Sequence, residues 1–240
     1  MKSTTVVIQA RMGSRRFRGK MLAALGGVSL IDWVILRVIQ GRNPRSVVLA
    51  TTTEAEDDAL EGRAHSLGIE VVRGPVDDVL TRFALAAEKF DSDFYIRVCG
   101  DNPFVDSNCL RELEDSIAPE FDLIFNHAPQ GDCTYADGLG GELISRELLR
   151  LLSARIGDPQ LREHVTLAAY TGVVDCRIKG LVAPPELAHR HLRFDVNTVD
   201  DLKNLSSLVD SESLSVASSG CEIVAASLKS GIDSNRPNVR

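Results

Sequence analysis

Five basic side chains follow the first apolar run of the chain and could bind a polyanion. They stand in the stretch RMGSRRFRGK, which begins at Arg11 and contains no acidic residue. A nucleoside triphosphate carries about four negative charges, and a protein that removes it from water must supply fixed cationic donors. Gly13 and Gly19 would let the backbone approach such a ligand closely. Arg11, Arg15 and Lys20 are therefore candidate phosphate ligands, and a solvated surface turn is the alternative interpretation.

Two common phosphate-binding patterns are absent from this stretch. The dinucleotide-binding pattern G-x-G-x-x-G cannot be formed, because Gly13 and Gly19 are the only glycines available. The pattern G-x-x-x-x-G-K-[ST] is approached by Gly13 and Gly19-Lys20, but five residues separate the glycines and Met21 replaces the magnesium-binding hydroxyl. We therefore expect side chains to hold the phosphates.

Two carboxylates could hold the metal ion that accompanies a triphosphate. Asp101 stands in RVCGDNP, directly after a predicted strand, and Asp195 stands in LRFDVNT, within another. Mg²⁺ prefers hard oxygen ligands and commonly takes one or two protein carboxylates. The alternatives are a turn-forming role for Asp101 and burial of Asp195 beside an arginine.

Two other segments contain residues that could contact a ligand. Arg73 lies in a Gly-Pro turn at a predicted strand end and could donate to a nucleobase carbonyl, although a surface ion pair is an equal alternative. Arg162, Glu163 and His164 stand together in a helical segment, where such a run commonly faces solvent.

Apolar runs alternate with segments of helical period through the first half of the chain. This alternation is typical of βαβ units and a mostly parallel sheet, so we predict an α/β fold. The predicted strands are residues 5–10, 46–51, 69–72 and 93–98. The predicted helices are residues 30–38, 54–68 and 77–90. The basic loop follows the first strand, at the sheet edge where ligands bind in such folds.

The second half of the chain is less regular. Residues 122–126 and 192–198 are predicted strands, and Thr198 with Asp201 forms a capping box that opens a helix. Residues 126–190 lack a clean alternation, so we expect an added layer beside the sheet. The main domain would span residues 1–210, followed by a Ser-rich, loosely held tail at 211–240.

The overall composition narrows the class of protein. The 240 residues are 44% hydrophobic and 25% charged, as in a soluble globular protein. A net charge of -7 argues against a general binder of nucleic acid or of anionic membranes. No apolar run approaches the ~20 residues of a membrane span, so a cytoplasmic location is expected. The five cysteines are scattered, and we expect reduced thiols.

Six segments occur in the order found in a known family. They are IQARMGSRRFRGKML, VVRGPVDDVLTRF, IRVCGDNPFVD, YADGLGGEL, REHVT and FDVNTVDDL. Over about residues 5–205 the chain resembles the cytidylyltransferase-like family that includes the spore coat polysaccharide biosynthesis protein F group. That group is similar to the acylneuraminate and 3-deoxy-manno-octulosonate cytidylyltransferases.

The resemblance implies a fold, an activity and a set of partners. The fold would be that of the nucleotide-diphospho-sugar transferases (GT-A, Rossmann-like), a mostly parallel sheet with helices on both faces. The activity would be transfer of CMP from CTP to a sugar, a sugar acid in particular, with release of pyrophosphate, in surface or spore-coat polysaccharide biosynthesis. Mg²⁺ would be the cofactor, and residues 126–190 would serve the acceptor or a homodimer contact.

The resemblance also implies roles for individual residues. The nucleotide-binding residues would be Ala10, Arg11, Gly13, Ser14, Arg15, Lys20 and Arg73. Of these, Arg11, Arg15 and Lys20 would also be catalytic, through positioning and charge neutralisation. Asp101 and Asp195 would hold magnesium. The candidate acceptor contacts are Asp137, Glu142, Arg162 and His164.

Three departures from the family pattern and two competing functions remain. Arg18 replaces a usual proline, Asn102 replaces a residue that is often cysteine, and Gly140 replaces a usual acidic residue, which bears on the acceptor. A glycosyltransferase of the same fold would carry D-x-D just after a strand, whereas Asp91 and Asp93 come before one. A non-catalytic nucleotide-binding protein would have lost a metal carboxylate, whereas both candidates are present.

Overall fold

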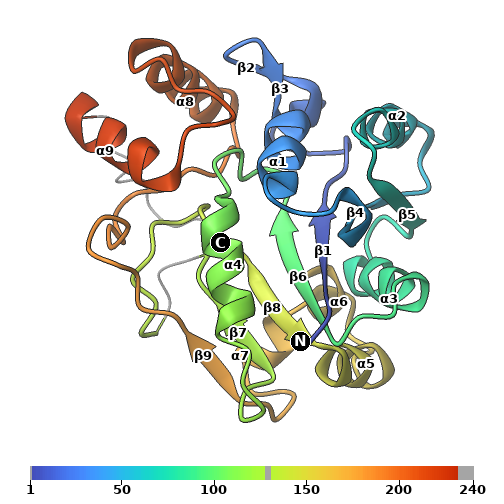
Figure 1. Cartoon of the computed structure of the whole chain (residues 1–240). Coiled ribbons are helices and arrows are strands. Elements are labelled where there is room, and N and C mark those ends of the chain that lie inside the picture. The colour runs from blue at the N-terminus through green and yellow to red at the C-terminus, as the bar shows by residue number, and fades with distance from the viewer. Residues whose placement is uncertain (1, 128–130, 232–240) are drawn as a thin grey trace.

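A central seven-stranded sheet organises the protein (Figure 1). The computed structural model describes residues 2–127 and 131–231. In chain order the sheet strands are β1 (Thr4–Gln9), β4 (Val47–Thr52), β5 (Glu70–Gly74), β6 (Phe94–Cys99), β7 (Leu123–Phe125), β8 (Glu142–Ser145) and β9 (Ile178–Gly180). Across the sheet their order is β5-β4-β1-β6-β8-β7-β9.

The four strands that the first half of the chain contributes to this sheet are parallel to one another. β1 pairs with β4 and β6, and β4 pairs with β5, all in parallel register. Every residue of β4 is buried, which is possible only when both faces of the sheet are covered. The predicted α/β class and mostly parallel sheet are therefore confirmed.

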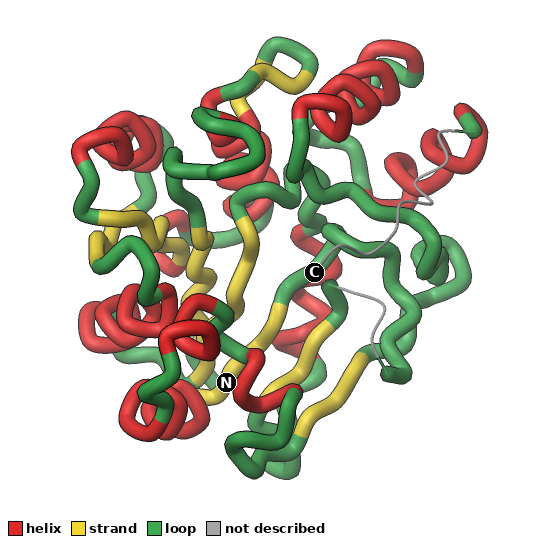
Figure 2. The backbone as a smooth tube through the Cα atoms, turned by 180° about the vertical axis from the view of Figure 1, so that it is seen from behind, coloured by secondary structure: helices red, strands yellow, loops and turns green. Residues whose placement is uncertain are grey.

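Helices cover both faces of the sheet, as Figure 1 and the reverse view of Figure 2 show. They are α1 (Leu30–Ile39), α2 (Asp58–Ser66), α3 (Val79–Lys89), α4 (Ser107–Asp115), α5 (Arg146–Arg155), α6 (Pro159–Glu163), α7 (Leu167–Tyr170), α8 (Val199–Ser211) and α9 (Gly220–Ser230). The apolar sides of α1, α2, α4, α8 and α9 share one core, and those of α3, α5 and α7 share the other. A small hairpin of β2 (Ala24–Leu25) and β3 (Val28–Ser29) precedes α1.

The segment expected as an added layer contributes two strands to the sheet itself. β8 lies between β6 and β7 and runs antiparallel to both, and β9 lies at the edge beside β7. The expectation of a separate layer over residues 126–190 is therefore wrong for these strands. The sequence pattern obscured β8 because its first residue is Glu142, whose charge is balanced by Arg97 directly opposite on β6.

Two other predicted elements differ from the structure. Residues 192–198 do not form a sheet strand but make a single parallel bridge, between Asp137 and Arg193. The helical segment 160–170 is divided into α6 and α7, with His164 at the break. The predicted capping box of Thr198 and Asp201 is confirmed at the start of α8.

The expected loose tail is folded over its described part. α9 buries Ile223 and Val224 in the main core, and Ser219 with Glu222 forms a second capping box. The serines that suggested a linker instead supply the turn and the cap before an apolar helix. The expectation is therefore wrong for residues 211–231, and residues 232–240 lie outside the described part of the chain.

Two further expectations concern membranes and thiols. Over residues 2–127 and 131–231, no helix combines the length and apolar composition that a bilayer span requires. All five cysteines lie in the described residues, and no two of them are joined by a disulfide.

Candidate active site

The basic loop is a defined structure at the carboxyl end of β1. Ala10 remains bonded to the sheet through its amide, 3.3 Å from the Ala50 carbonyl oxygen. The Met12 carbonyl then accepts from the amides of Ser14 and Gly19 at 2.8 and 3.2 Å, which closes the loop. Gly19 has a φ of 72°, in the left-handed region that favours glycine. The loop is therefore fixed before any ligand arrives.

Asp57 anchors the start of this loop. Its buried carboxylate accepts from the Met12 amide at 2.7 Å, from the Thr51 hydroxyl at 2.9 Å and from the Thr52 amide at 3.0 Å. Sequence analysis gave Asp57 no role, because an acidic residue in EAEDD resembles an ordinary helix-start residue. Thr51 and Thr52 were the available signal in the sequence, because a buried carboxylate needs several hydrogen-bond donors and these residues can supply them.

Lys20 brings the loop to the first candidate metal carboxylate. Its ammonium group donates to Asp101 Oδ2 at 2.7 Å and to the Val196 carbonyl oxygen at 2.9 Å. Lys20 is only 8% exposed, so the ion pair is largely shielded from water. Two residues predicted from separate motifs therefore meet in one place.

The second candidate carboxylate lies on the neighbouring segment. The Val196 amide donates to the Asp101 carbonyl oxygen at 2.9 Å, so the backbone beside Asp195 is joined to that of Asp101. The Asp195 carboxylate itself accepts hydrogen bonds from the Arg193 guanidinium, with a shortest distance of 2.7 Å, and from the side-chain amide of Asn197. Asp195 is therefore half-buried and paired with an arginine, as its alternative interpretation predicted.

The pair of carboxylates fits a hard divalent cation. No group of three or more acidic, histidine or cysteine side chains suited to a metal occurs among the described residues. Mg²⁺ needs no such group, because it commonly combines one or two carboxylates with water and substrate phosphate oxygens. In this structure Lys20 and Arg193 balance the charges of Asp101 and Asp195. The arrangement therefore has the donor chemistry that a metal-triphosphate complex requires.

Arg11 lies on the other side of the loop, beside the turn after β5. It donates to the Val76 carbonyl oxygen at 3.1 Å and pairs with Glu163 at 3.3 Å and with Asp77 at 3.6 Å. The buried Arg82 donates to the same Val76 oxygen, also at 3.1 Å. Burial, and then the charge of Arg11, lower the pKa of Arg82 to about 10. Arg82 could not be singled out from the sequence, because it resembles an ordinary arginine of an amphipathic helix.

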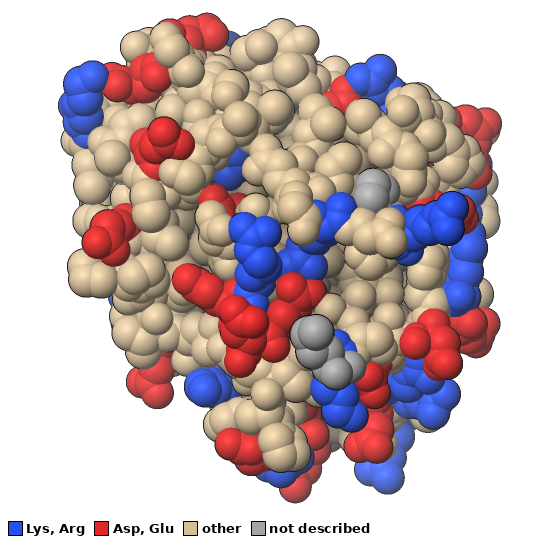
Figure 3. Space-filling view, in the orientation of Figure 1, with Lys and Arg blue, Asp and Glu red and all other residues tan. Residues whose placement is uncertain are grey.

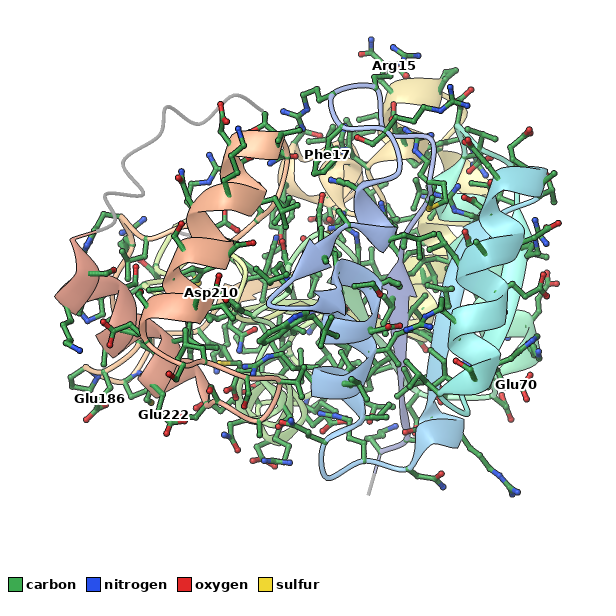
Figure 4. The ribbon with its side chains drawn as sticks, turned by 90° about the horizontal axis from the view of Figure 1, so that it is seen from above. Arg15, Phe17, Glu70, Glu186, Asp210 and Glu222 are labelled. Atoms are coloured by element: carbon green, nitrogen blue, oxygen red, sulfur yellow. The ribbon has the colours of Figure 1, made fainter. Side chains whose placement is uncertain are left out.

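The tip of the loop faces outward. Arg15 is exposed and projects away from the body of the protein (Figure 4). The Ser14 hydroxyl accepts from the Phe17 amide at 3.3 Å, and a Cβ on Gly13 would lie 2.8 Å from a Glu56 carboxylate oxygen. Arg15 is therefore an exposed cation at the outer tip of the loop.

Two predicted arginines are bound elsewhere. Arg73 donates to the Thr52 carbonyl oxygen at 2.7 Å and to Asp58 and Glu61 on α2, each at 2.6 Å. These contacts match the ion-pair alternative rather than a nucleobase contact. Arg162 donates to Asp78 at 2.7 Å and also to the Ile156 carbonyl at 2.6 Å, so it joins α6 to α3 and α5.

The remaining acceptor candidates surround the late part of the sheet. Glu142 is buried and accepts from Arg97 and, at 2.9 Å each, from Thr166 and Tyr170. Burial alone would raise the pKa of the Glu142 carboxyl, but Arg97, followed by His127, holds the pKa at about 2. This cluster explains why the GGEL and REHVT segments occur together, since the final threonine of REHVT bonds to the glutamate of GGEL.

Asp137 and His164 differ in their surroundings. Asp137 is buried, with its carboxylate 3.7 Å from Arg193, and so lies close to the Asp195 ion pair. His164 is exposed at the end of α6. The structure therefore joins Asp137 to the carboxylate side of the site and leaves His164 at the surface.

The D-x-D sequence of the competing glycosyltransferase hypothesis lies away from this site. Asp93 precedes β6, where it accepts from the Ser3 amide at 2.8 Å, and Asp91 pairs with Arg146. Both lie at the amino end of β6, whereas Asp101 follows its carboxyl end. The basic loop and the D-x-D sequence thus lie at opposite ends of the parallel strands.

Comparisons with known proteins show the family to which the chain belongs. A family model described as Cytidylyltransferase matches residues 5–127, which include the basic loop and Asp101. The chain is 32% identical over 216 residues, 87% of each chain, to the spore coat polysaccharide biosynthesis protein SpsF of Bacillus subtilis. The chain belongs to the cytidylyltransferase family. It is thus a CTP-dependent nucleotidyltransferase by family, as the resemblance implied.

Two other family members extend the comparison. A solved cytidylyltransferase from Leptospira borgpetersenii has a TM-score of 0.88 and 26% identity, with complete coverage of both chains. A 3-deoxy-manno-octulosonate cytidylyltransferase from Chlorobaculum parvum is 34% identical over 136 residues, 55% of this chain and 50% of that protein. The likeness to the solved cytidylyltransferase confirms the predicted nucleotidyltransferase fold over the whole chain.

Proposed function

We propose that this cytidylyltransferase transfers CMP from CTP to a sugar acid and releases pyrophosphate. The observation that carries the proposal is the meeting of Lys20 and Asp101 at 2.7 Å, with the Asp195 segment bonded beside them. A phosphate-binding cation and a pair of carboxylates at one sheet edge are the parts that nucleotidyl transfer needs.

The residues of the basic loop would bind and orient the triphosphate. Lys20 and Arg11 would neutralise phosphate oxygens from two sides of the loop, and Arg15 would close over them from the tip. A sugar hydroxyl would attack the α-phosphorus in line, forming a new P–O bond as the bond to pyrophosphate breaks. Such a step depends mainly on positioning and charge neutralisation.

Asp101 and Asp195 would hold Mg²⁺. The ion would supply positive charge at the α-phosphate and lower the pKa of the attacking hydroxyl. Each carboxylate would then exchange its present cationic partner for the ion, which frees Lys20 for the phosphates. We propose magnesium because its preferred oxygen ligands match this donor set.

The acceptor would lie on the side of the site formed by Asp137 and the Glu142 cluster. The names of the relatives refer to a polysaccharide pathway and to a 3-deoxy-sugar acid, which supports a sugar acid as acceptor. Glu142 would act through Arg97 and Tyr170, because its carboxylate is buried, and His164 would contact the acceptor from the surface. Arg73 and Arg162 are left out of the proposed site, since their guanidinium groups are bound elsewhere.

The homodimer and the cytoplasmic location remain predictions from the sequence. A homodimer through residues 126–190 would be tested by sedimentation velocity at several protein concentrations. A monomer at every concentration would contradict it.

Pyrophosphate release tests the proposed function. The protein would be mixed with CTP, UTP, ATP or GTP, with or without Mg²⁺, and with 3-deoxy-manno-octulosonate or N-acetylneuraminate as acceptor. We expect release only with CTP, Mg²⁺ and a sugar acid. Thermal shifts with the same nucleotides report binding separately, since a ligand at a hundredfold excess over Kd stabilises by about 2.7 kcal/mol. Binding of CTP without turnover on any acceptor would favour a non-catalytic protein.

A further inference from the structure

Arg37 joins the loop after β6 to the segment before α9. This α1 side chain is 1% exposed, and its guanidinium donates to the carbonyl oxygens of Val105 at 2.7 Å and Phe104 at 3.4 Å. It also donates to the carbonyl oxygens of Val216, at 3.1 Å, and Ser218. One buried cation thus satisfies carbonyls from two chain segments that are more than a hundred residues apart in sequence.

Asp106 makes a second connection between the same two segments. Its carboxylate caps α4 through the Asn108 amide at 2.7 Å and also accepts from the Gly220 amide at the start of α9. Arg37 lies 3.7 Å from the same carboxylate. A Cβ on Gly220 would lie 3.1 Å from Asp106 Oδ2, so the close approach favours glycine at this position.

These contacts fix the short loop that begins at Asp101. Phe104 packs edge-on between Trp33 and Phe194, with ring-centroid distances of 5.8 and 5.5 Å. The Asp106 amide donates to the Leu139 carbonyl oxygen at 2.7 Å. Residues 101–106 therefore have little freedom of their own, and their position depends on the groups that hold Phe104, Val105 and Asp106.

We propose that residues 215–230, the C-terminal clamp, position the Asp101 carboxylate for the metal-triphosphate complex. This inference rests on the proposed function, in which Asp101 is a metal ligand. The clamp holds the far end of the loop through Arg37 and Asp106, while Lys20 and Val196 hold its beginning. The clamp lies outside residues 5–127, which the family model matches, so this chain builds part of its site support from its C-terminal region.

The test is a substitution that disturbs the clamp without removing core side chains. Gly220→Ala adds one methyl group against Asp106, and Gly62→Ala on α2 is the matched control because a Cβ there meets nothing within 4 Å. Hydrogen exchange of the metal-free, nucleotide-free protein would follow the amides of residues 102 and 104–109. We expect exchange there to accelerate roughly tenfold in Gly220→Ala, with α3 unchanged and Gly62→Ala like wild type.

A kinetic measurement links the clamp to Asp101. The Mg²⁺ concentration for half-maximal CMP transfer should rise about fivefold or more in Gly220→Ala, while the KM for CTP at saturating Mg²⁺ changes little. Arg37→Lys, which keeps the charge but loses the fork of donors, should give the same pattern. Faster exchange confined to α9, or an unchanged Mg²⁺ requirement in a turning-over enzyme, would overturn the inference.

The exchange measurement separates this inference from the proposed function. If the wild-type protein transfers no CMP, the proposed function fails. In that case, coupled exchange between α9 and residues 102–109 still supports the clamp as a device that fixes the loop, and uncoupled exchange overturns it.

Discussion

Lys20 has two roles that depend on the same buried position. A lysine that is 8% exposed would be costly to keep charged without partners, and Asp101 with the Val196 carbonyl supplies them. These partners hold the ammonium group at the edge of the sheet, where a triphosphate would need it. The lysine therefore joins the basic loop to the carboxylate segments and, in the proposed reaction, binds phosphate.

Replacing Lys20 should reduce both binding and turnover. We expect Lys20→Met to lower kcat/KM for CTP by about 100-fold or more, as loss of one positioned charge commonly does. Arg18→Met in the same loop is the control, because its side chain is 88% exposed and pairs with Glu56 only at 3.7 Å. Steady-state kinetics with CTP as the varied substrate would measure both. Equal effects of the two substitutions would contradict a specific role for Lys20.

Asp57 holds the start of the basic loop through its hydrogen bond from the Met12 amide. We expect Asp57→Asn to destabilise the protein by about 2 kcal/mol, because an amide group cannot accept from all of the Met12, Thr51 and Thr52 donors. The KM for CTP should rise more than kcat falls, since the substitution moves the loop and leaves its cations in place. Urea unfolding and steady-state kinetics would measure the two effects. A loss of stability with no change in KM would leave Asp57 with a purely structural role.

At the scale of elements, the sequence predicted the four parallel strands correctly and failed where polar contacts decide the structure. β1, β4, β5 and β6 each contain consecutive buried apolar residues, and burial between two helical layers leaves such residues few alternatives. β8 was missed because it begins with the charged Glu142 and has only two apolar residues, Leu143 and Ile144. Residues 192–198 have the pattern of a strand, but their backbone bonds go to loop residues, including Asp137 and Asp101.

The site residues likewise divide into those that the sequence could predict and those that depend on polar contacts. Lys20 and Asp101 could be predicted together because each follows a parallel strand, and the carboxyl ends of such strands meet at one edge. The contacts of Arg73 and Arg162 could not, because they depend on acids that tertiary packing brings near. Arg82 and Asp57 are buried polar residues whose sequence surroundings are typical of ordinary helices.

The connection before β8 depends on a glycine at position 140. A Cβ on Gly140 would lie 2.5 Å from the Asn126 carbonyl oxygen and would also overlap the Asn126 side-chain oxygen. We expect Gly140→Ala to cost about 3 kcal/mol or more in the free energy of unfolding, because backbone must move to relieve the overlap. Gly157→Ala is the control, since a Cβ there meets nothing within 4 Å. Equal midpoints in urea unfolding for both variants would contradict this packing.

At the scale of the whole molecule, charge is distributed rather than gathered. The face in Figure 3 carries acidic and basic side chains side by side. The chain has a net charge of -7 although the loop is locally basic, because its 34 acidic residues outnumber its 27 lysines and arginines. This arrangement suits a small polyanionic ligand better than a long one.

Glu142 ties the acid stability of the fold to one buried cluster. Its pKa is lowered to about 2 from an ordinary value of 4.5, so its charged form contributes stability above about pH 4.5, and this is lost as pH falls toward 2. Glu142→Gln should cost about 3 kcal/mol at neutral pH, because Arg97 loses its buried partner. The variant should also lose less stability than wild type between pH 5 and pH 2.

Urea unfolding at several pH values would test this prediction. Glu186→Gln is a suitable control, because Glu186 is exposed (Figure 4). We expect the control to follow the wild-type curve. A Glu142→Gln curve parallel to wild type through the acid range would contradict the lowered pKa.

The late position of β8 in the chain has a consequence for biosynthesis. β6 spans Phe94–Cys99, yet its outer neighbour is completed only at Ser145. While a ribosome is still adding the intervening residues, the nascent parallel half presents an unpaired, largely apolar strand edge, which can recruit the wrong partner. We therefore expect slow translation between these two points to increase the dependence of the emerging chain on chaperones, until the antiparallel strand arrives to cover that edge.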